Sequence, residues 1–345
     1  MNPFKTIGTL LLLLALVMLP LSGCGGSDSD SAGSGSGSGG GVEKKYTLAV
    51  IGKTTVNDYW EAVESGAMVA GEELGAKILW TGPDAETNHT QQSEIVDNMV
   101  NRSVDGIVLA PTNFTALVRA VESAVKRGIP VIIIDSPLDT DTTTSTVATN
   151  NREGGRVAGE ALAAAIGENA TYGGKVAMLR FLEGSASTEQ REEGFEKAAG
   201  SAGLKLVDDP YTKGQGGTTD AADTADALLR RHIKNNVLEL DGIFASNQPT
   251  AVGMVRKLDE FRKQGFTINA KVVGFDSHTV LNQAVRDGKL VGIVVQDPQN
   301  MGRLGVKTMI DHLEDRAVEA FVDTGVTLVN KDNIEDPDIK TLIGE

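Results

Sequence analysis

The sequence predicts an α/β protein with two doubly wound, Rossmann-like domains, each built on a parallel sheet. Short apolar runs bounded by polar residues recur along the chain, and such runs suit strands that are covered on both faces. Segments with apolar residues at helical spacing separate these runs, as parallel strands with right-handed crossovers require. The alternation occurs in two series, and the roughly 300 residues left after the ends suffice for two domains with cores of their own.

The first series begins at residue 46. Strands are expected at 46–51, 77–80, 106–110 and 130–135, and helices at 58–74, 91–101 and 114–127. In the first of these helices, Trp60, Val63, Ala67 and Ala70 recur at helical spacing. This spacing predicts one buried helix face against a sheet.

A second series follows a threonine-rich passage at 139–146 and a helix expected at 153–166. Its strands are expected at 175–181, 204–207, 242–245 and 272–275, and its helices at 188–202, 220–233 and 250–263. A strand at 290–295, a helix at 301–313 and a strand at 324–329 remain. These segments are natural if the chain returns to the first domain. We therefore expect a hinge with several crossovers, which joins a lobe of 46–148 plus 297–325 to a lobe of 149–296 plus 326–345.

The N-terminal segment predicts export. Lys5 precedes an apolar stretch at 7–21 that is too short and too close to the N-terminus for a membrane span. The stretch ends in LSGC, which resembles the lipobox of bacterial lipoproteins. We therefore expect a signal peptide at 1–23, a lipidated Cys24 and a flexible Gly/Ser tether over 24–45. Cys24 is the sole cysteine of the sequence, so no intramolecular disulfide is expected.

Composition and motifs argue against several classes of function. The chain has 32 Lys plus Arg against 47 Asp plus Glu, a net charge of -15, which disfavours a nucleic-acid partner. Gly52-Lys53-Thr54 lacks the glycine-rich loop of a phosphate site, and no G-x-S-x-G elbow marks a hydrolase. The four histidines show no metal-ligand spacing with one another. A DNA-binding repressor would need a helix-turn-helix where the expected tether lies. We expect no enzyme activity, no cofactor and no metal site.

Polar and aromatic side chains follow the expected strands at the points where these strands end. In open parallel sheets that edge is where ligands bind. The side chains concerned are Lys53, Asn57, Tyr59 and Trp60 in the first series, Asp135 and Ser136 after its fourth strand, and 183–191, Asn247, Asp276 and Gln296 in the second series. Asp276 taken alone could instead cap the helix that follows it. Tyr59 and Trp60 could be core residues, although neighbours on a helix face different directions, so at most one is expected to lie fully in the core.

This set of side chains suits a small polyhydroxylated ligand. Each ligand hydroxyl both donates and accepts, and therefore needs partners such as Asp, Asn, Gln and Arg. Aromatic faces can cover the apolar C–H surface of a sugar while polar groups fix its orientation.

Six stretches carry a family resemblance that runs from residue 46 to residue 329. They are GKTTVNDYW, GIPVIIIDS, GSASTEQREEGF, GIFASNQPTAVG, VVGFDSHTVLNQAVRDGKL and VVQDPQNMGRLGV. In their order and spacing the chain resembles the type I periplasmic binding proteins, specifically the ribose-binding-protein-like sugar group. The resemblance implies two lobes that close on a ligand like a hinged trap, and no catalysis.

The resemblance also implies which residues contact the ligand. These are Lys53, Asn57, Tyr59, Trp60, Asp135, Ser136, Arg191, Asn247, Asp276 and Gln296. Tyr59 and Trp60 match the stacking pair of the first β-α loop, and Gln296 matches a hinge glutamine. Two departures affect the choice of sugar. Ser136 stands where the ribose binder has an arginine, and 214–218 (GQGGT) lacks the aromatic expected from the second domain, so a more open pocket is expected on that side.

These observations predict a lipid-anchored, extracytoplasmic and monomeric substrate-binding protein of an ABC importer, with a pentose or hexose as its ligand. A permease in the membrane would be its partner. Two alternatives remain open from the sequence. The protein could serve a membrane sensor or chemoreceptor, or it could bind a nucleoside, a polyol or an autoinducer.

Overall fold

The computed structural model describes residues 45–345. The expected signal peptide at 1–23, Cys24 and the glycine-rich part of the tether lie outside the described residues. Between residues 45 and 345 no helix is both long and apolar enough to cross a membrane.

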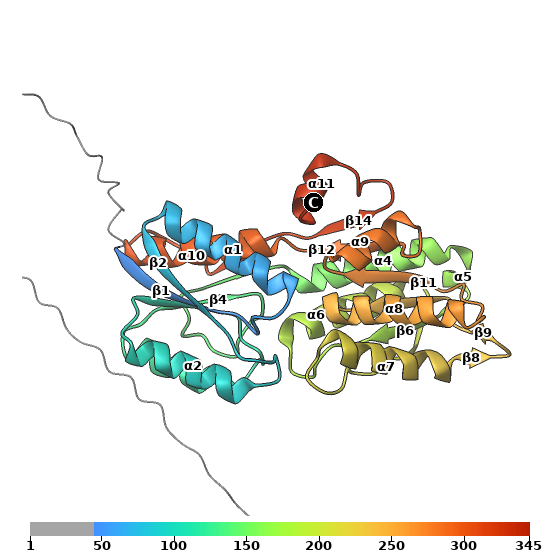
Figure 1. Ribbon diagram of the computed structural model, residues 1–345, viewed down its shortest axis with the longest axis horizontal. Helices are drawn as coiled ribbons and strands as arrows, with labels where there is room; N and C mark the ends of the chain where they lie inside the picture. Colours follow the sequence, from blue (N-terminus) through green and yellow to red (C-terminus); the bar gives the residue numbers. More distant parts are fainter. Residues whose placement is uncertain (1–44) are drawn as a thin grey trace, which may run out of the picture. The chain divides into compact units, whose positions relative to one another are not determined.

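The first lobe is built on a six-stranded sheet whose neighbouring strands are all parallel. In spatial order its strands are β13 (Phe321–Asp323), β5 (Ser145–Ala148), β4 (Val131–Ile134), β3 (Gly106–Leu109), β1 (Tyr46–Ile51) and β2 (Ala76–Thr81). Helices α1 (Asp58–Glu73) and α10 (Pro298–Leu313) cover one face, and α2 (His89–Asn101) and α3 (Val118–Lys126) cover the other (Figure 1). Alternate residues of β1 serve the two cores, since Leu48 packs with α1 and Ala49 with α2.

The second lobe repeats this plan with one antiparallel edge strand. In spatial order its strands are β14 (Thr327–Asn330), β12 (Gly292–Val295), β11 (Lys271–Phe275), β10 (Gly242–Ala245), β6 (Lys175–Leu179) and β7 (Lys205–Asp208). Helices α4 (Asn151–Ile166) and α6 (Ala186–Ser201) cover one face, and α7 (Thr218–Arg231), α8 (Gln248–Lys263) and α9 (Thr279–Arg286) cover the other. Strand β14 pairs antiparallel with β12. Short elements complete the lobe, namely α5 (Glu168–Thr171), the hairpin β8 (Ile233–Lys234) and β9 (Val237–Leu238), and α11 (Pro337–Leu342).

The chain passes between the two sheets at three places within the described residues: from β5 to α4, from β12 to α10, and from β13 to β14. The third passage corrects one sequence expectation. We expected a strand at 324–329, but β13 ends at Asp323, β14 begins at Thr327, and the residues between them cross from one sheet to the other.

Two glycines allow helices to cross at close range. A Cβ at Gly302 of α10 would lie 2.1 Å from the Val63 carbonyl oxygen of α1, and a Cβ at Gly155 of α4 would lie 1.9 Å from the Arg191 carbonyl oxygen of α6. A side chain at either position would force the two helices apart. Gly155 therefore lets α6, which carries Arg191, lie close against α4.

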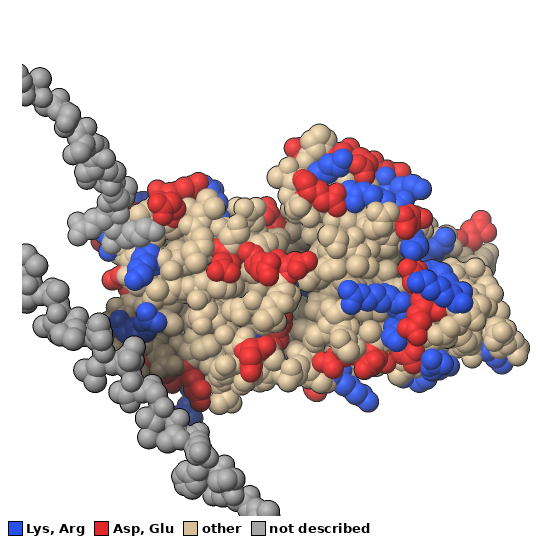
Figure 2. All heavy atoms as spheres, viewed as in Figure 1, with Lys and Arg blue, Asp and Glu red and all other residues tan. Residues whose placement is uncertain are grey.

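The two-domain parallel α/β fold expected from the sequence is confirmed, but several short elements were missed. The threonine-rich passage at 139–146 runs into β5, and β5, β13, α9, α11 and the β8–β9 hairpin were not expected. On the face shown in Figure 2, basic side chains gather mainly on the second lobe. Many are paired with acids, as Arg286 is with Glu335 and Glu345. Exposed pairs of this kind add little to stability.

Candidate functional site

A cavity lies between the carboxyl ends of the strands of the two lobes. Its lining residues are Lys53, Asn57, Tyr59, Trp60, Glu86, Asp135, Phe181, Ser185, Ser187, Thr188, Arg191, Asn247, Gln248, Pro249, Asp276 and Gln296. The cavity is narrow, with a free volume of about 30 Å³. The structure thus brings together every sequence-predicted ligand residue except Ser136.

Asp135 directly follows β4, with a left-handed φ of 65° that turns its carboxylate toward the cavity edge of the sheet. Its Oδ1 accepts a hydrogen bond from the Tyr59 hydroxyl at 2.9 Å. Its Oδ2 lies 2.7 Å from Lys53 Nζ and accepts from Ser136 Oγ at 3.0 Å. Burial alone would raise the pKa of Asp135, but the charges of Lys53 and Arg191 and the hydrogen bonds from Lys53 and Tyr59 outweigh burial and hold the pKa below its ordinary value.

Asp276 follows β11 in the same way, with a φ of 66°. Its Oδ1 accepts from Gln296 Nε2 at 2.7 Å, and its Oδ2 accepts from the Gln248 backbone N–H at 3.0 Å. Arg191 Nη1 lies 3.8 Å from Oδ2. Burial raises the pKa of Asp276, and Arg191 and the hydrogen bonds offset only part of that rise. The helix-cap alternative for Asp276 is wrong, because His278 caps α9.

Lys53 bridges the two lobes. Besides its ion pair with Asp135, its Nζ donates to Ser136 Oγ at 2.6 Å and to Ser187 Oγ, on α6 of the second lobe, at 3.1 Å. Ser136 is buried and is not among the lining residues. Its short side chain ends on Lys53 and Asp135, so it positions these two residues and does not reach the cavity. A backbone bond from Phe114 N–H to the Gly184 carbonyl, 3.0 Å long, also joins the lobes.

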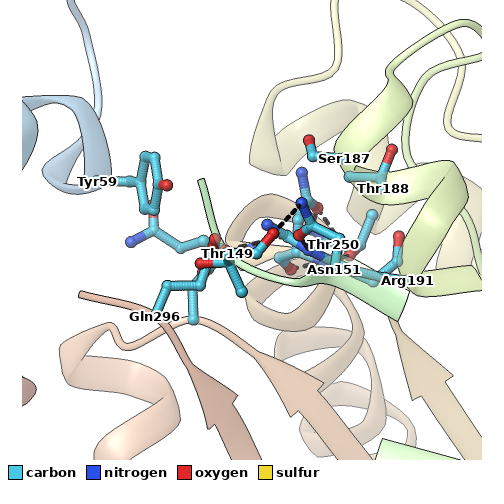
Figure 3. Close-up of polar contacts among 12 residues, drawn as sticks. Tyr59, Thr149, Asn151, Ser187, Thr188, Arg191, Thr250 and Gln296 are labelled. Carbon is cyan, nitrogen blue, oxygen red and sulfur yellow. Dashed lines mark hydrogen bonds and ion pairs between the residues drawn. The ribbon is translucent and has the colours of Figure 1, made fainter. Parts of the chain in front are cut away.

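Arg191 is held rigidly on the second-lobe side of the cavity (Figure 3). Its Nε donates to Asn151 Oδ1 at 2.8 Å and its Nη1 donates to the Ser246 carbonyl at 3.1 Å. The guanidinium lies over the Phe275 ring, 4.0 Å from the centroid. Within residues 45–345 the Nη2 group has no hydrogen-bond partner, so it is free to donate to a ligand.

The adjacent aromatics Tyr59 and Trp60 divide their roles. Trp60 is 2% exposed and packs in the core of the first lobe, whereas Tyr59 is only partly buried. Their rings meet edge to face, with centroids 5.1 Å apart and planes at 82°. The expectation that at most one of them lies fully in the core is confirmed.

The second lobe also supplies an aromatic residue to the cavity, but from another segment than 214–218. Phe181, just beyond β6, lines the cavity. A Cβ at Gly216 would lie 2.9 Å from the Phe181 ring, so the glycine-rich segment makes room for this aromatic side chain. The sequence expectation of a bare side near Gly216 overlooked Phe181.

Asn57 and Asn247 have a second role as helix caps. Asn57 Oδ1 accepts from the Trp60 backbone N–H at 3.0 Å, and Asn247 Oδ1 accepts from the Thr250 backbone N–H at 3.2 Å. Capping fixes both side chains. In the part of the chain that the structure describes, neither Nδ2 group has an acceptor, so both can donate to a ligand.

Several lining residues were missed in the sequence, above all Glu86 and Gln248. Glu86 lies between β2 and α2 and accepts from Trp60 Nε1 at 3.2 Å. Burial raises the pKa of Glu86, against opposing effects of Lys53 and the Trp60 hydrogen bond. No periodic pattern marks the loop that holds Glu86. Gln248 had a signal, because it follows Asn247 at a helix start and its backbone N–H is therefore free for Asp276.

Some polar groups at the cavity lack partners. Gln296 Oε1 and Ser185 Oγ are buried and have no hydrogen-bond partner among the described residues. Both residues line the cavity. Buried polar atoms without partners are costly, so these two oxygens indicate a place where a ligand can donate. Across the described residues no group of three or more His, Cys, Asp or Glu is arranged to hold a metal ion.

A buried carboxyl lies directly behind the cavity wall. Glu192 Oε1 accepts from Ser246 Oγ at 3.1 Å and from the Phe181 backbone N–H at 3.3 Å. Arg180 Nη1 approaches Oε2 to 3.7 Å. Burial raises the pKa of Glu192 to about 7, although Arg180 and the hydrogen bonds oppose the rise.

Comparisons with known proteins agree with this architecture. The model of the periplasmic binding protein domain family matches residues 48–317. The ribose import binding protein of Escherichia coli K12 is 28% identical over 291 residues, which cover 83% of this chain and 91% of that protein. The ribose import binding protein of Bacillus subtilis is 25% identical and covers 84% of this chain and 88% of its own length.

Solved structures extend the likeness. A carbohydrate transporter solute-binding protein from Agrobacterium radiobacter, in complex with D-arabinose, has a TM-score of 0.79 and 37% identity, covering 86% of this chain and 98% of that chain. An ABC transporter solute-binding protein from Agrobacterium vitis, with bound D-fucose, has a TM-score of 0.79 and 35% identity, covering 86% and 99%. On the match to the family model, which spans most of the residues that form both lobes, the chain belongs to the periplasmic binding protein family.

Proposed function

We propose that this chain is the extracytoplasmic substrate-binding protein of an ABC importer and that it binds a monosaccharide in the cavity between its lobes. The observation that carries the proposal is the pair of carboxylates, Asp135 and Asp276, which lie at matching strand ends of the two lobes and line one cavity. Two solved relatives bind single sugars, D-arabinose and D-fucose, and two curated relatives are named for ribose import.

The two lobes are in direct contact at the cavity. The free space is narrow, and Lys53 and Phe114 bond directly to the second lobe. This is the arrangement expected when the lobes are closed, so the lobes must part for a ligand to enter.

The hydrogen-bonding groups of the cavity suit ligand hydroxyls better than charged ligand groups. Asp135 and Asp276 accept, the Nδ2 groups of Asn57 and Asn247 donate, and Arg191 Nη2 donates. A sugar hydroxyl can serve donors and acceptors at once. It can also supply the missing donors to Gln296 Oε1 and Ser185 Oγ.

The three crossings between the lobes support a hinge mechanism. Contacts from both lobes reach a ligand together only in the closed form, so ligand shifts the population toward that form. The closed form is then the shape that a permease recognises. We assign no covalent chemistry to the site.

We further propose that Cys24 is lipidated after removal of residues 1–23, and that residues 24–45 tether the lobes to a membrane. The family works outside the cytoplasm, so its members must be exported, and a signal peptide at residues 1–23 would serve that purpose. The anchor is tested by Cys24→Ser, which should release the exported protein from the membrane fraction. An exported Cys24→Ser protein that stays membrane-bound would show that the anchor lies elsewhere.

Isothermal titration calorimetry of the full chain with D-ribose, D-arabinose and D-fucose tests the ligand class. At least one sugar should bind, and at 100 times its Kd it should stabilise the fold by about 2.7 kcal/mol in thermal unfolding. No heat and no stabilisation with any monosaccharide would refute the proposal. Binding of a nucleoside in the same assay would favour the alternative ligand class.

A further inference from the structure

The charges that line the cavity do not balance. The lining residues include three carboxylates, Glu86, Asp135 and Asp276, and two cations, Lys53 and Arg191. Lys53 Nζ lies 2.7 Å from Asp135, and Arg191 Nη1 lies 3.8 Å from Asp276. Glu86 remains without a cation at ion-pair distance in residues 45–345, and its hydrogen bond comes from the neutral indole of Trp60.

Glu86 also has bonding capacity left for a ligand. Oε1 accepts from Trp60 Nε1 at 3.2 Å, and Oε2 has no hydrogen-bond partner in the region the structure describes. Because Trp60 is 2% exposed and packed in the core, the indole holds Glu86 in a fixed place. The carboxylate therefore offers a fixed acceptor to whatever fills the cavity.

We propose that Glu86 is a specificity-determining residue that accepts a hydrogen bond from an uncharged sugar and excludes acidic sugars. The inference rests on the proposed function of the cavity as a monosaccharide site. An ionised Glu86 can only accept, so a sugar hydroxyl can pair with it and a sugar carboxylate cannot. A ligand carboxylate would also bring two negative charges together in a buried site, where water screens them poorly. Rejection of this kind is specificity by repulsion.

A purely structural role for Glu86 would be to orient Trp60. The two roles predict different results. Loss of the Trp60 orientation would weaken the binding of neutral and acidic sugars alike, whereas loss of the charge would change the ratio of their affinities. Glu86→Gln separates the two, because the amide oxygen can still accept from Trp60 Nε1 while the charge is gone.

The test measures affinities of the full chain by calorimetry for D-ribose, D-arabinose and D-fucose, and for D-galacturonate and D-glucuronate. Wild type should bind at least one neutral sugar and neither uronate. Glu86→Gln should shift the ratio of uronate to neutral-sugar affinity toward the uronate by about tenfold or more. Glu61→Gln, an exposed acid on α1, is the matched control and should leave the ratio unchanged. Glu86→Asp retains the negative charge and should therefore still reject uronates. This variant can be measured even if Glu86→Gln does not fold, and uronate binding by it would contradict the proposed role of the charge.

Three results would overturn the inference: uronate binding by wild type as tight as that of its best neutral sugar, a wild-type affinity ratio in Glu86→Gln, or uronate binding by Glu86→Asp. If wild type binds no sugar at all, the proposed function fails first and the inference falls with it. That outcome is distinct from neutral-sugar binding with an unchanged ratio in Glu86→Gln, which refutes only the role of Glu86.

Discussion

Asp135 in the first lobe and Asp276 in the second lobe have the same backbone setting and different electrostatic settings. Each follows a buried strand, with φ of 65° and 66°, and each is nearly buried, at 3% and 6% exposure. Asp135 has an ammonium at 2.7 Å, whereas Asp276 is held by an amide and a backbone N–H, with its cation 3.8 Å away. Their pKa values consequently move in opposite directions. Equivalent backbone geometry thus fixes where an acid lies, and its neighbours decide how strongly it holds a proton.

The largest effect is expected on the free energy of unfolding when Asp135, the acid with the close cation, is truncated to alanine. Asp135→Ala leaves the Lys53 ammonium buried with only hydroxyl partners, so the free energy of unfolding should fall by about 3–5 kcal/mol. Urea denaturation followed by circular dichroism measures this loss. The control is Asp139→Ala in the exposed loop beyond, which should change the free energy by about 0.5 kcal/mol or less. Equal losses for the two variants would contradict the ion-pair account.

Stability should depend on pH in opposite ways for the acids of the two lobes. In the second lobe the pKa of Glu192 is raised from 4.5 to about 7, so the folded state binds the proton more tightly than the unfolded chain. Its contribution to stability should therefore fall as pH rises from 4.5 to about 7, by about 3 kcal/mol in all. Asp276 acts in the same direction. Asp135, with a lowered pKa, stabilises above pH 3.8 and loses this contribution as pH falls below that value.

The contribution of Glu192 to the pH dependence of stability can be isolated by comparing wild type with Glu192→Gln. Free energies of unfolding measured from pH 4.5 to 7.5 should decline less steeply in Glu192→Gln than in wild type. Glu193→Gln changes the exposed neighbour on the same helix and should leave the slope as it is. Parallel profiles for wild type and Glu192→Gln would show that the buried carboxyl does not titrate in this window.

Asp276→Asn should reduce the affinity for the sugar more than it reduces the stability of the fold. The new amide oxygen can still accept from the Gln248 N–H, and its amino group can donate to Gln296 Oε1 once the Gln296 amide, whose Nε2 faces Asp276, turns over. Unfolding should change by about 1 kcal/mol or less, while sugar binding loses an ionised acceptor and weakens by about 1–3 kcal/mol. Calorimetry and urea denaturation of one preparation measure both quantities. A stability loss as large as that of Asp135→Ala would erase the contrast between the lobes.

The smallest effect is expected where the lobes touch. Ser187→Ala removes the 3.1 Å bond from Lys53 to α6 but leaves the ion pair with Asp135 in place. The closed form should lose about 0.5–1.5 kcal/mol, and affinity for the sugar should fall by the same free energy. Ser201→Ala at the far end of α6 serves as the control. Unchanged affinity in Ser187→Ala would mean that this bond does not help to hold the lobes together.

The sequence predicted the layered α/β plan because buried strands and amphipathic helices leave periodic patterns. Strand β5 (STVA) begins with two polar residues and so left no apolar run, and the three residues of β13 are too few for a pattern to show. They exist because the neighbouring strands offer them partners across the sheet. The family expected from the six stretches is confirmed.

The candidate site divides in the same way. Residues that directly follow strands, such as Asp135 and Asp276, could be predicted because the end of a buried strand fixes their position. Glu86 could not, because its place depends on how the loop after β2 packs against Trp60. Ser136 was misplaced for a related reason. Lys53 donates a hydrogen bond to the Ser136 hydroxyl, and Ser136 therefore lies behind the cavity wall.

The hydrogen bond between Trp60 and Glu86 gives the molecule an intrinsic optical reporter. The chain contains two tryptophans, Trp60 and Trp80, and both belong to the first lobe. Only Trp60 lines the cavity, and its indole N–H already contacts a carboxylate that faces the binding space. Filling or emptying that space should therefore alter the emission of Trp60 directly. Changes within the second lobe should reach the fluorescence only through closure.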